Sequence, residues 1–436
     1  MNILSYALLF IQLILLFIGS YWLIISFFGL GKIPKIPQKT PKKRFLLLIP
    51  AHNEEKVIGN LLKNLTDIDY PKELYQIYVI ADNCTDKTAN IAKTLGINVL
   101  KHTSLPNEKK GKPYAIKYAL DNLREQLDEF DAIAIFDADN LVTKNYLKEM
   151  NKHLLNGEKL IQCYLDTKNP NDTFITLGYA TAYFYMNRAW QLAKYKLHLG
   201  NAIGGTGFCV DTNVIKKIGW TTRSLTEDLE FTMQCLLNNI KATWCHTARV
   251  YDEKPEKFNA SCVQRLRWSR GHWDACFKYF GPLLLRAITK ADRCAFDGVM
   301  YLLNPVKALL EAAMWVMWGI GVLVFKQSFF ILFPIWVWGS FFIFSCVYVM
   351  IVLGIDTDSK FNRVKALLGM LFFNVSYIPL FFWALLTYKD KTWIRTEHVK
   401  SISTPPSNTS VTVYNHGVYK YSSIDIVDKT ITEVNL

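Results

Sequence analysis

The sequence lacks charge over three long stretches. No charged residue occurs in Asn2–Gly31, Ser328–Ile355 or Ala366–Tyr388. Each stretch reaches the ~20 residues that a helix needs to cross a bilayer, and a buried helix of a soluble protein rarely stays uncharged for so long. Although a hydrophobic fraction of 51% would fit a large soluble protein, the clustering of the apolar residues predicts membrane insertion.

Metal-binding cysteine patterns are absent as well. The nine cysteines are scattered without any C-x-x-C pair, and we expect reduced, non-ligating thiols in a cytosolic domain. The adjacent Cys245 and His246 are interpreted as a core pair. The net charge is +13, but no Lys/Arg-rich helix with interleaved aromatic residues occurs, which argues against nucleic acid as a partner. The positive charge suits a protein that lies against an anionic leaflet and handles a phosphorylated donor.

The first apolar stretch lacks the marks of a cleaved signal peptide. It has no basic start, its apolar part is too long, and no A-x-A site follows. We therefore expect residues 1–31 to form a retained transmembrane helix. Lys and Arg are frequent in residues 32–44, so the positive-inside rule predicts a cytosolic domain and an N-terminus outside the plasma membrane.

Residues 32–260 alternate short apolar runs with amphipathic stretches, which predicts an α/β fold with a mostly parallel sheet. The expected strands are Phe45–Pro50, Tyr75–Ile80 and Ala132–Phe136. The expected helices are Asn53–Leu65, Thr85–Leu95 and Lys112–Leu127. Ligands of such sheets bind beyond the carboxyl ends of the strands, so the polar residues that close these strands are the candidates for a site.

Acidic residues follow two of the strands. Asp82 closes one of them, and taken alone it could equally be a helix cap. Asp137 and Asp139 form a D-x-D step after another strand. Two hard oxygen ligands at this spacing suit Mg²⁺ or Mn²⁺ held between protein and substrate phosphates. Such a metal would offset the charge on a departing diphosphate.

Two further motifs lie downstream. Thr226-Glu227-Asp228 reads as a helix start that Thr226 would cap; the alternative is that Asp228 serves as a general base toward a sugar hydroxyl. Gln264-x-x-Arg267-Trp268 combines a guanidinium suited to phosphate with an indole face suited to a sugar ring. The competing interpretation is an Arg/Trp membrane anchor, and we expect that role for Trp273.

The C-terminal third is membrane-associated in this interpretation. Residues 261–300 carry the Q-x-x-R-W segment and suit an amphipathic interfacial helix. Residues 301–388 hold two spans, at about Ala308–Phe325 and Ser328–Ile355, and a third spanning or re-entrant segment. Asn374 and Pro379 interrupt this third segment, which favours an interfacial position.

Smaller features complete this region. Lys307 and Glu311, one helical turn apart, are expected to pair as a structural tether. Residues 389–400 are basic, and residues 401–436 read as a polar tail.

The ordered set of Asp82, D-x-D, T-E-D and Q-x-x-R-W resembles the processive branch of glycosyltransferase family 2, which holds cellulose, chitin, hyaluronan and poly-N-acetylglucosamine synthases. The resemblance covers about residues 30–290 and the flanking membrane helices. It implies a nucleotide-diphospho-sugar transferase domain of the GT-A type. It also implies Mg²⁺ or Mn²⁺ as cofactor, a UDP-sugar donor, a growing polysaccharide acceptor and contact with membrane lipid. Oligomers or accessory secretion subunits are compatible with it.

The resemblance also implies roles for individual residues. The catalytic carboxylates would be Asp228, as the base, and Glu227. The donor would be bound by His52, Asn53, Glu54, Asp82, Lys112, Asp137 and Arg267, with Asp137 and Asp139 holding the metal. The acceptor would meet Gly205, Thr206, Gly207, Gln264 and Trp268; the glycines of Gly204–Gly207 independently suit a close backbone approach. Trp393, Thr396 and His398 would belong to a gating loop over the bound nucleotide, although their sequence departs from the F-x-V-T-x-K form.

The expected reaction is an inverting, processive synthesis of a β-linked polysaccharide, with a β-glucan from UDP-glucose favoured. The first alternative is a polymer of N-acetylglucosamine. The second is a non-processive transferase that places one sugar on a lipid. A catalytically silent membrane scaffold is the third, and the intact acidic motifs argue against it.

Overall fold

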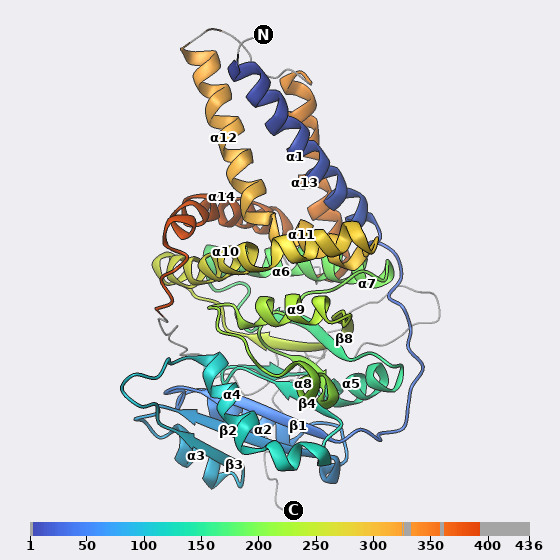
Figure 1. Cartoon of the computed structure of the whole chain (residues 1–436), viewed down its shortest axis with the longest axis vertical. Coiled ribbons are helices and arrows are strands. Elements are labelled where there is room, and N and C mark those ends of the chain that lie inside the picture. Colours follow the sequence, from blue (N-terminus) through green and yellow to red (C-terminus); the bar gives the residue numbers. More distant parts are fainter. Residues whose placement is uncertain (1–2, 325, 327–332, 358–361, 393–436) are drawn as a thin grey trace, which may run out of the picture.

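The computed structural model describes residues 3–324, 326, 333–357 and 362–392. An α/β body carries a layer of long helices on one side, and further helices rise from that layer (Figure 1). The predicted alternation of strands and helices is confirmed for the α/β body.

One mixed sheet of eight strands forms the centre of the body, in the order β3-β2-β1-β4-β7-β6-β8-β5. Its strands are β1 (Phe45–Ala51), β2 (Tyr75–Asp82), β3 (Asn98–His102), β4 (Ala132–Ile135), β5 (Leu141–Val142), β6 (Leu160–Thr167), β7 (Phe208–Asp211) and β8 (Thr243–Asp252). Strands β1 to β4 pair in parallel, whereas β7 is antiparallel to both β4 and β6. The carboxyl ends of β1, β2 and β4 therefore meet at one edge of the sheet.

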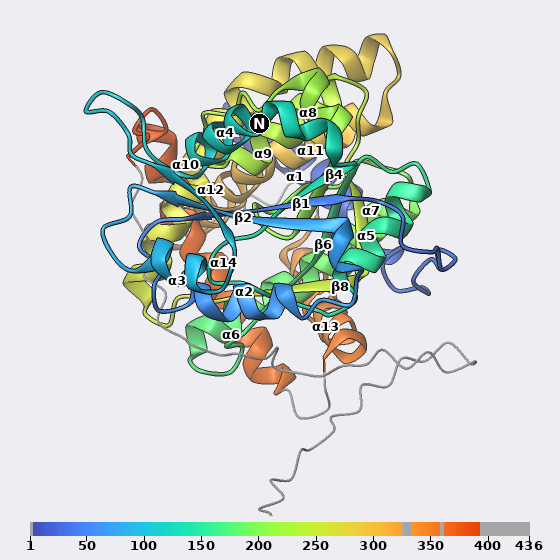
Figure 2. The ribbon, with the colours of Figure 1, turned by 90° about the horizontal axis from the view of Figure 1, so that it is seen from below.

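Both faces of the sheet are covered, as the continuous apolar runs predict. Alternate residues of β1 point to opposite sides: Leu47 packs in one core and Leu46 in the other. The first core holds α2 (Ile58–Thr66), α3 (Thr88–Thr94) and α5 (Tyr146–Leu155). The second core holds α4 (Lys112–Asn122), α8 (Thr212–Ile218) and α9 (Glu227–Leu237). Figure 2 shows α4 and α8 on one side of the sheet and α2 on the other.

The layer above the body is made of α6 (Phe174–Tyr185), α10 (Phe258–Thr289), α11 (Arg293–Leu302) and α14 (Arg363–Thr387). A π-helical segment, η3 (Met186–Leu192), and the short α7 (Ala193–Lys196) continue α6. Helix α14 packs against both α6 and α10. It lies across the molecule, at a steep angle to the three rising helices (Figure 1).

The rising helices are α1 (Ile3–Phe27), α12 (Asn304–Leu323) and α13 (Ile335–Asp356). Together with α14 they are the four helices of the described residues that are long and apolar enough to cross a membrane. Outward-facing side chains such as Phe10, Val316 and Ile343 are 65%, 61% and 64% exposed, which suits contact with lipid.

Buried ion pairs fix the rising helices to the layer below. The Arg188 guanidinium in η3 lies 2.6 Å from Asp356 at the end of α13 and donates to the Gly29 carbonyl just after α1. Within the layer, Lys194 pairs with Asp297 of α11 at 2.9 Å, and the Tyr21 hydroxyl of α1 donates to this Asp297 at 2.9 Å. These contacts hold the inner ends of α1 and α13 in place beside the body.

The membrane-anchor role expected for Trp273 is wrong. Its side chain is 5% exposed, and its indole nitrogen donates to the Phe381 carbonyl of α14 at 3.0 Å. Helix α10, which carries it, packs between α9 and α14. The physical reason is that α14 covers the apolar face of α10 that carries Trp273. This face therefore contacts protein and not lipid.

Candidate active site

Lys112 links three of the predicted motifs. It opens α4 after Gly111, and its ammonium lies 2.5 Å from an Asp137 oxygen and 3.5 Å from a Glu227 oxygen. It also donates to the Gly205 carbonyl at 2.7 Å. Burial opposes the charged form of Lys112, but the carboxylates of Asp137 and Glu227 outweigh burial and raise its pKa. A fixed positive charge therefore lies between the D-x-D step, the T-E-D step and the glycine-rich loop.

Hydrogen bonds hold the D-x-D turn at both of its aspartates. The Asp137 backbone nitrogen donates to Asn140 and Thr206, which fixes the turn after β4. One Asp139 oxygen accepts from the Glu253 backbone nitrogen at 2.9 Å, and the side chain is 4% exposed. The acidic turn is thus held rigidly at the carboxyl end of β4.

Asp252, the last residue of β8, is a third carboxylate close to this turn. Burial raises its pKa, the charge of Lys254 opposes that effect, and the charges of Asp139 and Asp137 add to it. One of its oxygens accepts from Lys254 at 2.6 Å, whereas Oδ1 is buried without a hydrogen-bond partner among the described residues. The unsatisfied oxygen suits a divalent cation whose coordination is completed by substrate phosphates, but the described residues alone do not supply a full set of ligands. No group of three or more His, Cys, Asp or Glu with ligand geometry occurs in the described ranges.

The T-E-D step begins α9, as predicted, but Thr226 makes no side-chain cap hydrogen bond. Its side chain packs instead against Gly271 of α10, where an added Cβ would meet Thr226 at 2.3 Å. The turn before α9 is stabilised by Glu230, which accepts from the backbone nitrogens of Arg223 and Ser224. The capping expectation for Thr226 is therefore wrong, because close packing of α9 on α10 occupies the threonine.

Asp228 faces the same space as Lys112 and Gly205. Burial, followed by the negative charge of Glu227, raises the pKa of Asp228 to about 7, against the lowering effects of a backbone hydrogen bond from Leu229 and of Lys112 and Arg267. A carboxyl with a pKa near neutrality can accept a proton from a hydroxyl and release it to solvent. The position fits the general base that the sequence suggested.

The glycine-rich loop has two different functions in the fold. Gly205 has φ +80°, and a Cβ there would lie 3.3 Å from Asp228 Oδ2, so its missing side chain leaves room beside the carboxylate. Gly207 has φ +63°, and a Cβ there would meet Cys163 and Val250 at 2.7 Å. Gly205 and Thr206 line the cavity described below, but Gly207 is not among its lining residues. Gly207 is needed for close packing of the sheet. The sequence alone could not distinguish this role from acceptor binding.

The Q-x-x-R-W segment lies on α10. Gln264 accepts from Tyr179 at 3.0 Å, Arg267 donates to the Leu225 carbonyl at 3.3 Å, and the Trp268 ring meets Tyr179 edge-on at 6.2 Å. All three line the cavity together with the acidic motifs. The intervening Arg265 is 1% exposed and donates to Phe373 and Ser376 of α14, so it is a structural residue.

The expected nucleotide-binding residues lie at the ends of β1 and β2. The Asp82 carboxylate accepts from His102 at 2.7 Å and from Asn83 at 2.8 Å; it therefore does not cap a helix. The His52 ring contacts the Asp82 carbonyl at 2.7 Å. His52, Glu54 and Asp82 line the cavity.

Asn53 is the expected nucleotide-binding residue that the lining does not include. It has φ +57°, and its side-chain oxygen accepts from the Thr85 backbone nitrogen at 2.8 Å. The expected gating residues Trp393, Thr396 and His398 lie outside the described residues.

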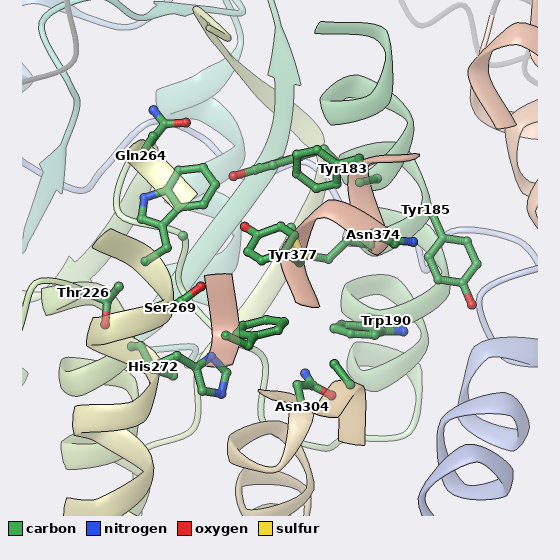
Figure 3. A pocket seen from close by; sticks show the side chains of 18 of the residues that line it. Tyr183, Tyr185, Trp190, Thr226, Gln264, Ser269, His272, Asn304, Asn374 and Tyr377 are labelled. Carbon is green, nitrogen blue, oxygen red and sulfur yellow. The ribbon is translucent and has the colours of Figure 1, made fainter. Parts of the chain in front are cut away.

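A single cavity of about 1080 Å³ joins all these motifs and continues into the helical part. That volume exceeds the range usual for a pocket that holds one small ligand. Figure 3 shows Tyr183 of α6, Tyr377 of α14 and Trp190 of η3 around the passage between Gln264 and Asn304. Beyond this aromatic passage, defined here by these three rings, the cavity is lined by α1, α12 and α13.

Sequence reasoning missed two sets of residues. Asp252 closes β8 as Asp82 closes β2, so the same rule would have found it had β8 been recognised. The aromatic passage could not be found, because its rings come from elements almost two hundred residues apart and only the fold brings them together.

The fold and the site define a nucleotide-sugar transferase domain of the GT-A type. A family described as glycosyltransferase-like family 2 matches residues 41–271, more than half of the 436 residues. The chain belongs to this family. The family prediction is confirmed, whereas membership of its processive branch remains a prediction.

Curated relatives match more than half of the chain. A probable glycosyltransferase, YdaM, of Bacillus subtilis (strain 168) is 28% identical over 258 residues, which are 58% of this chain and 60% of that protein. The beta-monoglucosyldiacylglycerol synthase of Nostoc sp. is 28% identical over 266 residues, which are 59% of this chain and 54% of that protein. The chain thus spans less than two thirds of the length of these relatives.

A solved structure is similar over most of the chain. It is a mannosyltransferase from Pyrobaculum calidifontis in complex with GDP-Man and Mn²⁺, with a TM-score of 0.49 and 15% identity, covering 88% of this chain and 96% of that one.

Proposed function

We propose that this protein transfers one hexose from a nucleotide-diphospho-sugar to a hydroxyl of a membrane lipid. The observation that carries the proposal is the continuity of the cavity. It runs from Asp137 and Asp228 through the aromatic passage to helices long and apolar enough to cross a membrane. An acceptor hydroxyl could therefore reach Asp228 while the rest of the acceptor remained among apolar helices.

The cavity also opens toward the position of the lipid. Trp315 of α12 and Phe341 and Phe342 of α13 line it, yet they are 43%, 44% and 55% exposed. In the described residues α12 and α13 share no extensive interface, since α12 packs on α1 and α14 whereas α13 packs on α6 and α14. We infer a lateral opening between α12 and α13, where exposed apolar side chains suit acyl chains.

The reaction would proceed by a single displacement. Asp228 takes the proton of the acceptor hydroxyl, the hydroxyl oxygen forms a bond to the anomeric carbon, and the bond from that carbon to the diphosphate breaks. Lys112 and Arg267 hold the departing diphosphate through charge-assisted hydrogen bonds. A divalent cation held by Asp137 and Asp139, when bound, would neutralise part of the diphosphate charge.

The names of the relatives support a lipid acceptor, because the Nostoc protein is named for a glucosylated diacylglycerol. Helix α14 would then lie in the membrane interface rather than span the bilayer, since it runs across the rising helices (Figure 1). This position keeps residues 389–392 on the cytosolic side, in agreement with the positive charges of Lys389 and Lys391.

Processive polymerisation is the second candidate function. Trp268 and the rings of the aromatic passage could guide a growing polysaccharide toward the helical part of the cavity, because sugars stack well on flat aromatic rings. The Q-x-x-R-W segment favours this function, and the continuity of the cavity is compatible with it.

One experiment separates the two functions. The purified protein in phosphatidylcholine proteoliposomes is given radiolabelled UDP-glucose or UDP-N-acetylglucosamine with Mn²⁺, with and without diacylglycerol. Label that moves to a lipid carrying one sugar supports the proposal. High-mass, hydrolase-sensitive polymer formed without lipid adduct would overturn it in favour of polymerisation. Absence of lipid product, polymer and UDP release with UDP- and GDP-sugars would refute both functions.

A further inference from the structure

A charged pair lies within the helical part of the cavity. Lys307 Nζ is 2.6 Å from Glu311 Oε1, one turn further along α12, which confirms the predicted pairing. Both residues line the cavity, and their side chains remain 27% and 43% exposed. Full charges in a helix apolar enough to cross a membrane are costly and usually functional.

The predicted role of this pair as a structural tether is not supported by its position. Both partners belong to α12, so the pair connects no two elements of the fold. Ion pairs at this helical spacing stabilise a helix only weakly. The pair therefore calls for another explanation, and its place on the wall of the cavity suggests one.

The wall of α12 that faces the cavity is polar at its start and apolar further on. Asn304, Lys307 and Glu311 line the cavity at helical spacing, followed by Ala312 and Trp315. Figure 3 shows Asn304 on the helical side of the aromatic passage, beside Trp190. With a rise of about 1.5 Å per residue, Lys307 and Glu311 lie roughly 5 to 10 Å beyond Asn304 along α12. The polar stretch thus lies between the transfer site and the apolar part of the cavity, where the headgroup of a lipid would come to rest.

We propose that Lys307 and Glu311 form the subsite for the acceptor headgroup and select an uncharged, hydroxyl-bearing lipid over an anionic one. This inference rests on the proposed lipid acceptor. While the hydroxyl of a neutral lipid lies at Asp228, its ester carbonyls can accept a hydrogen bond from Lys307 without bringing a charge close to Glu311. An anionic headgroup would meet the carboxylate of Glu311, and Lys307 is already neutralised by it. Like charges brought together in a partly desolvated site oppose binding strongly.

Substitution of one partner tests the selection. Glu311→Gln keeps the shape of the side chain and leaves Lys307 as an unpaired cation in the cavity. Lys307→Gln leaves Glu311 as an unpaired anion. We expect Glu311→Gln to raise transfer to an anionic lipid relative to a neutral one by about tenfold or more, and Lys307→Gln not to raise it. Asp121→Asn is the matched control, because it removes the acid of another lysine–carboxylate pair at the same helical spacing, Lys117–Asp121 on the exposed face of α4.

The assay uses phosphatidylcholine proteoliposomes that contain equal amounts of diacylglycerol and phosphatidylglycerol, which both carry a free hydroxyl. The ratio of the two glycosylated lipids is measured by mass spectrometry for each variant, and thermal unfolding checks that each variant is folded. The expected result is a preference for diacylglycerol in the unsubstituted protein and in Asp121→Asn, and a loss of that preference in Glu311→Gln alone. An unchanged ratio in a folded and active Glu311→Gln would overturn the headgroup role while leaving the lipid transferase intact. If the unsubstituted protein glycosylates neither lipid and forms polymer instead, the proposed function fails, and the headgroup role fails with it.

Discussion

A methyl group on Gly205 would lie 3.3 Å from the carboxylate oxygen Oδ2 of Asp228 and 3.8 Å from the ammonium of Lys112. The loop residue without a side chain and the proposed base therefore share one small space. The reacting hydroxyl has to occupy that space for the proposed reaction to occur.

Gly205→Ala should consequently lower kcat by about 100-fold, since small misplacements of reacting groups have effects of this size. Gly157→Ala is the matched control. Gly157 has a similar φ of +88°, but nothing lies within 4 Å of its added Cβ, so it reproduces the backbone strain without the contact. Equal losses of activity in both variants would show that strain alone, and not the space beside Asp228, is responsible.

The rate of transfer should fall on the acid side of neutrality. A general base acts in its ionised form, and the pKa of Asp228 is raised to about 7 by burial and by Glu227. Below that pH the carboxyl is protonated, so kcat/KM should fall tenfold per pH unit; well above it, kcat/KM should level off. Asp228→Asn should abolish transfer and leave nucleotide binding largely intact, as measured by calorimetry with UDP. Normal turnover of this variant would remove Asp228 from the mechanism.

Glu227→Gln extends this test. Removal of the negative charge next to Asp228 should lower the pKa of Asp228 and move the acid limb of the kcat/KM profile to lower pH. The measurement is the midpoint of that limb, compared with the unsubstituted protein. A midpoint that stays in place would mean that another group controls the profile.

Asp252 should contribute to metal binding. Its Oδ1 is buried without a hydrogen-bond partner among the described residues, and its charge interacts with Asp137 and Asp139. Asp252→Asn should raise the Mn²⁺ concentration for half-maximal activity by roughly tenfold or more. Asp211→Asn serves as the control, because Asp211 also closes a strand but caps α8, a role that asparagine fulfils equally well. Similar metal dependence in both variants would assign Asp252 to the fold alone.

Trp268 and Trp273 should respond differently to truncation. Trp268 lines the cavity, and Trp268→Ala should raise the KM for the acceptor by about tenfold with little change in the donor KM. Trp273 is buried against α14, and Trp273→Ala should lower the free energy of unfolding by about 3 kcal/mol or more. If Trp268→Ala shortens a polymer product and does not raise the KM for a lipid acceptor, the processive function is favoured.

The sequence by itself determined the elements and much of the chemistry. Short-range patterns of apolar and polar residues are enough to predict several elements. These are the strands before Asp82 and Asp137, the helix that begins at Glu227, and the long uncharged helices. The predicted Asp82, Asp137 and Asp139 converge on one cavity because the carboxyl ends of parallel strands must meet at one edge of a sheet. The T-E-D step and the Q-x-x-R-W segment reach the same cavity from helices α9 and α10.

Only the tertiary structure decided what depends on contacts between distant segments. Gly205 and Gly207 look alike in the sequence, but one faces the cavity and the other faces Cys163 and Val250. Trp268 and Trp273 share one helix, and the path of α14 decides which of them is covered. Periodicity records only which face of an element is apolar; whether protein, substrate or lipid covers that face depends on the packing of elements far apart in the chain.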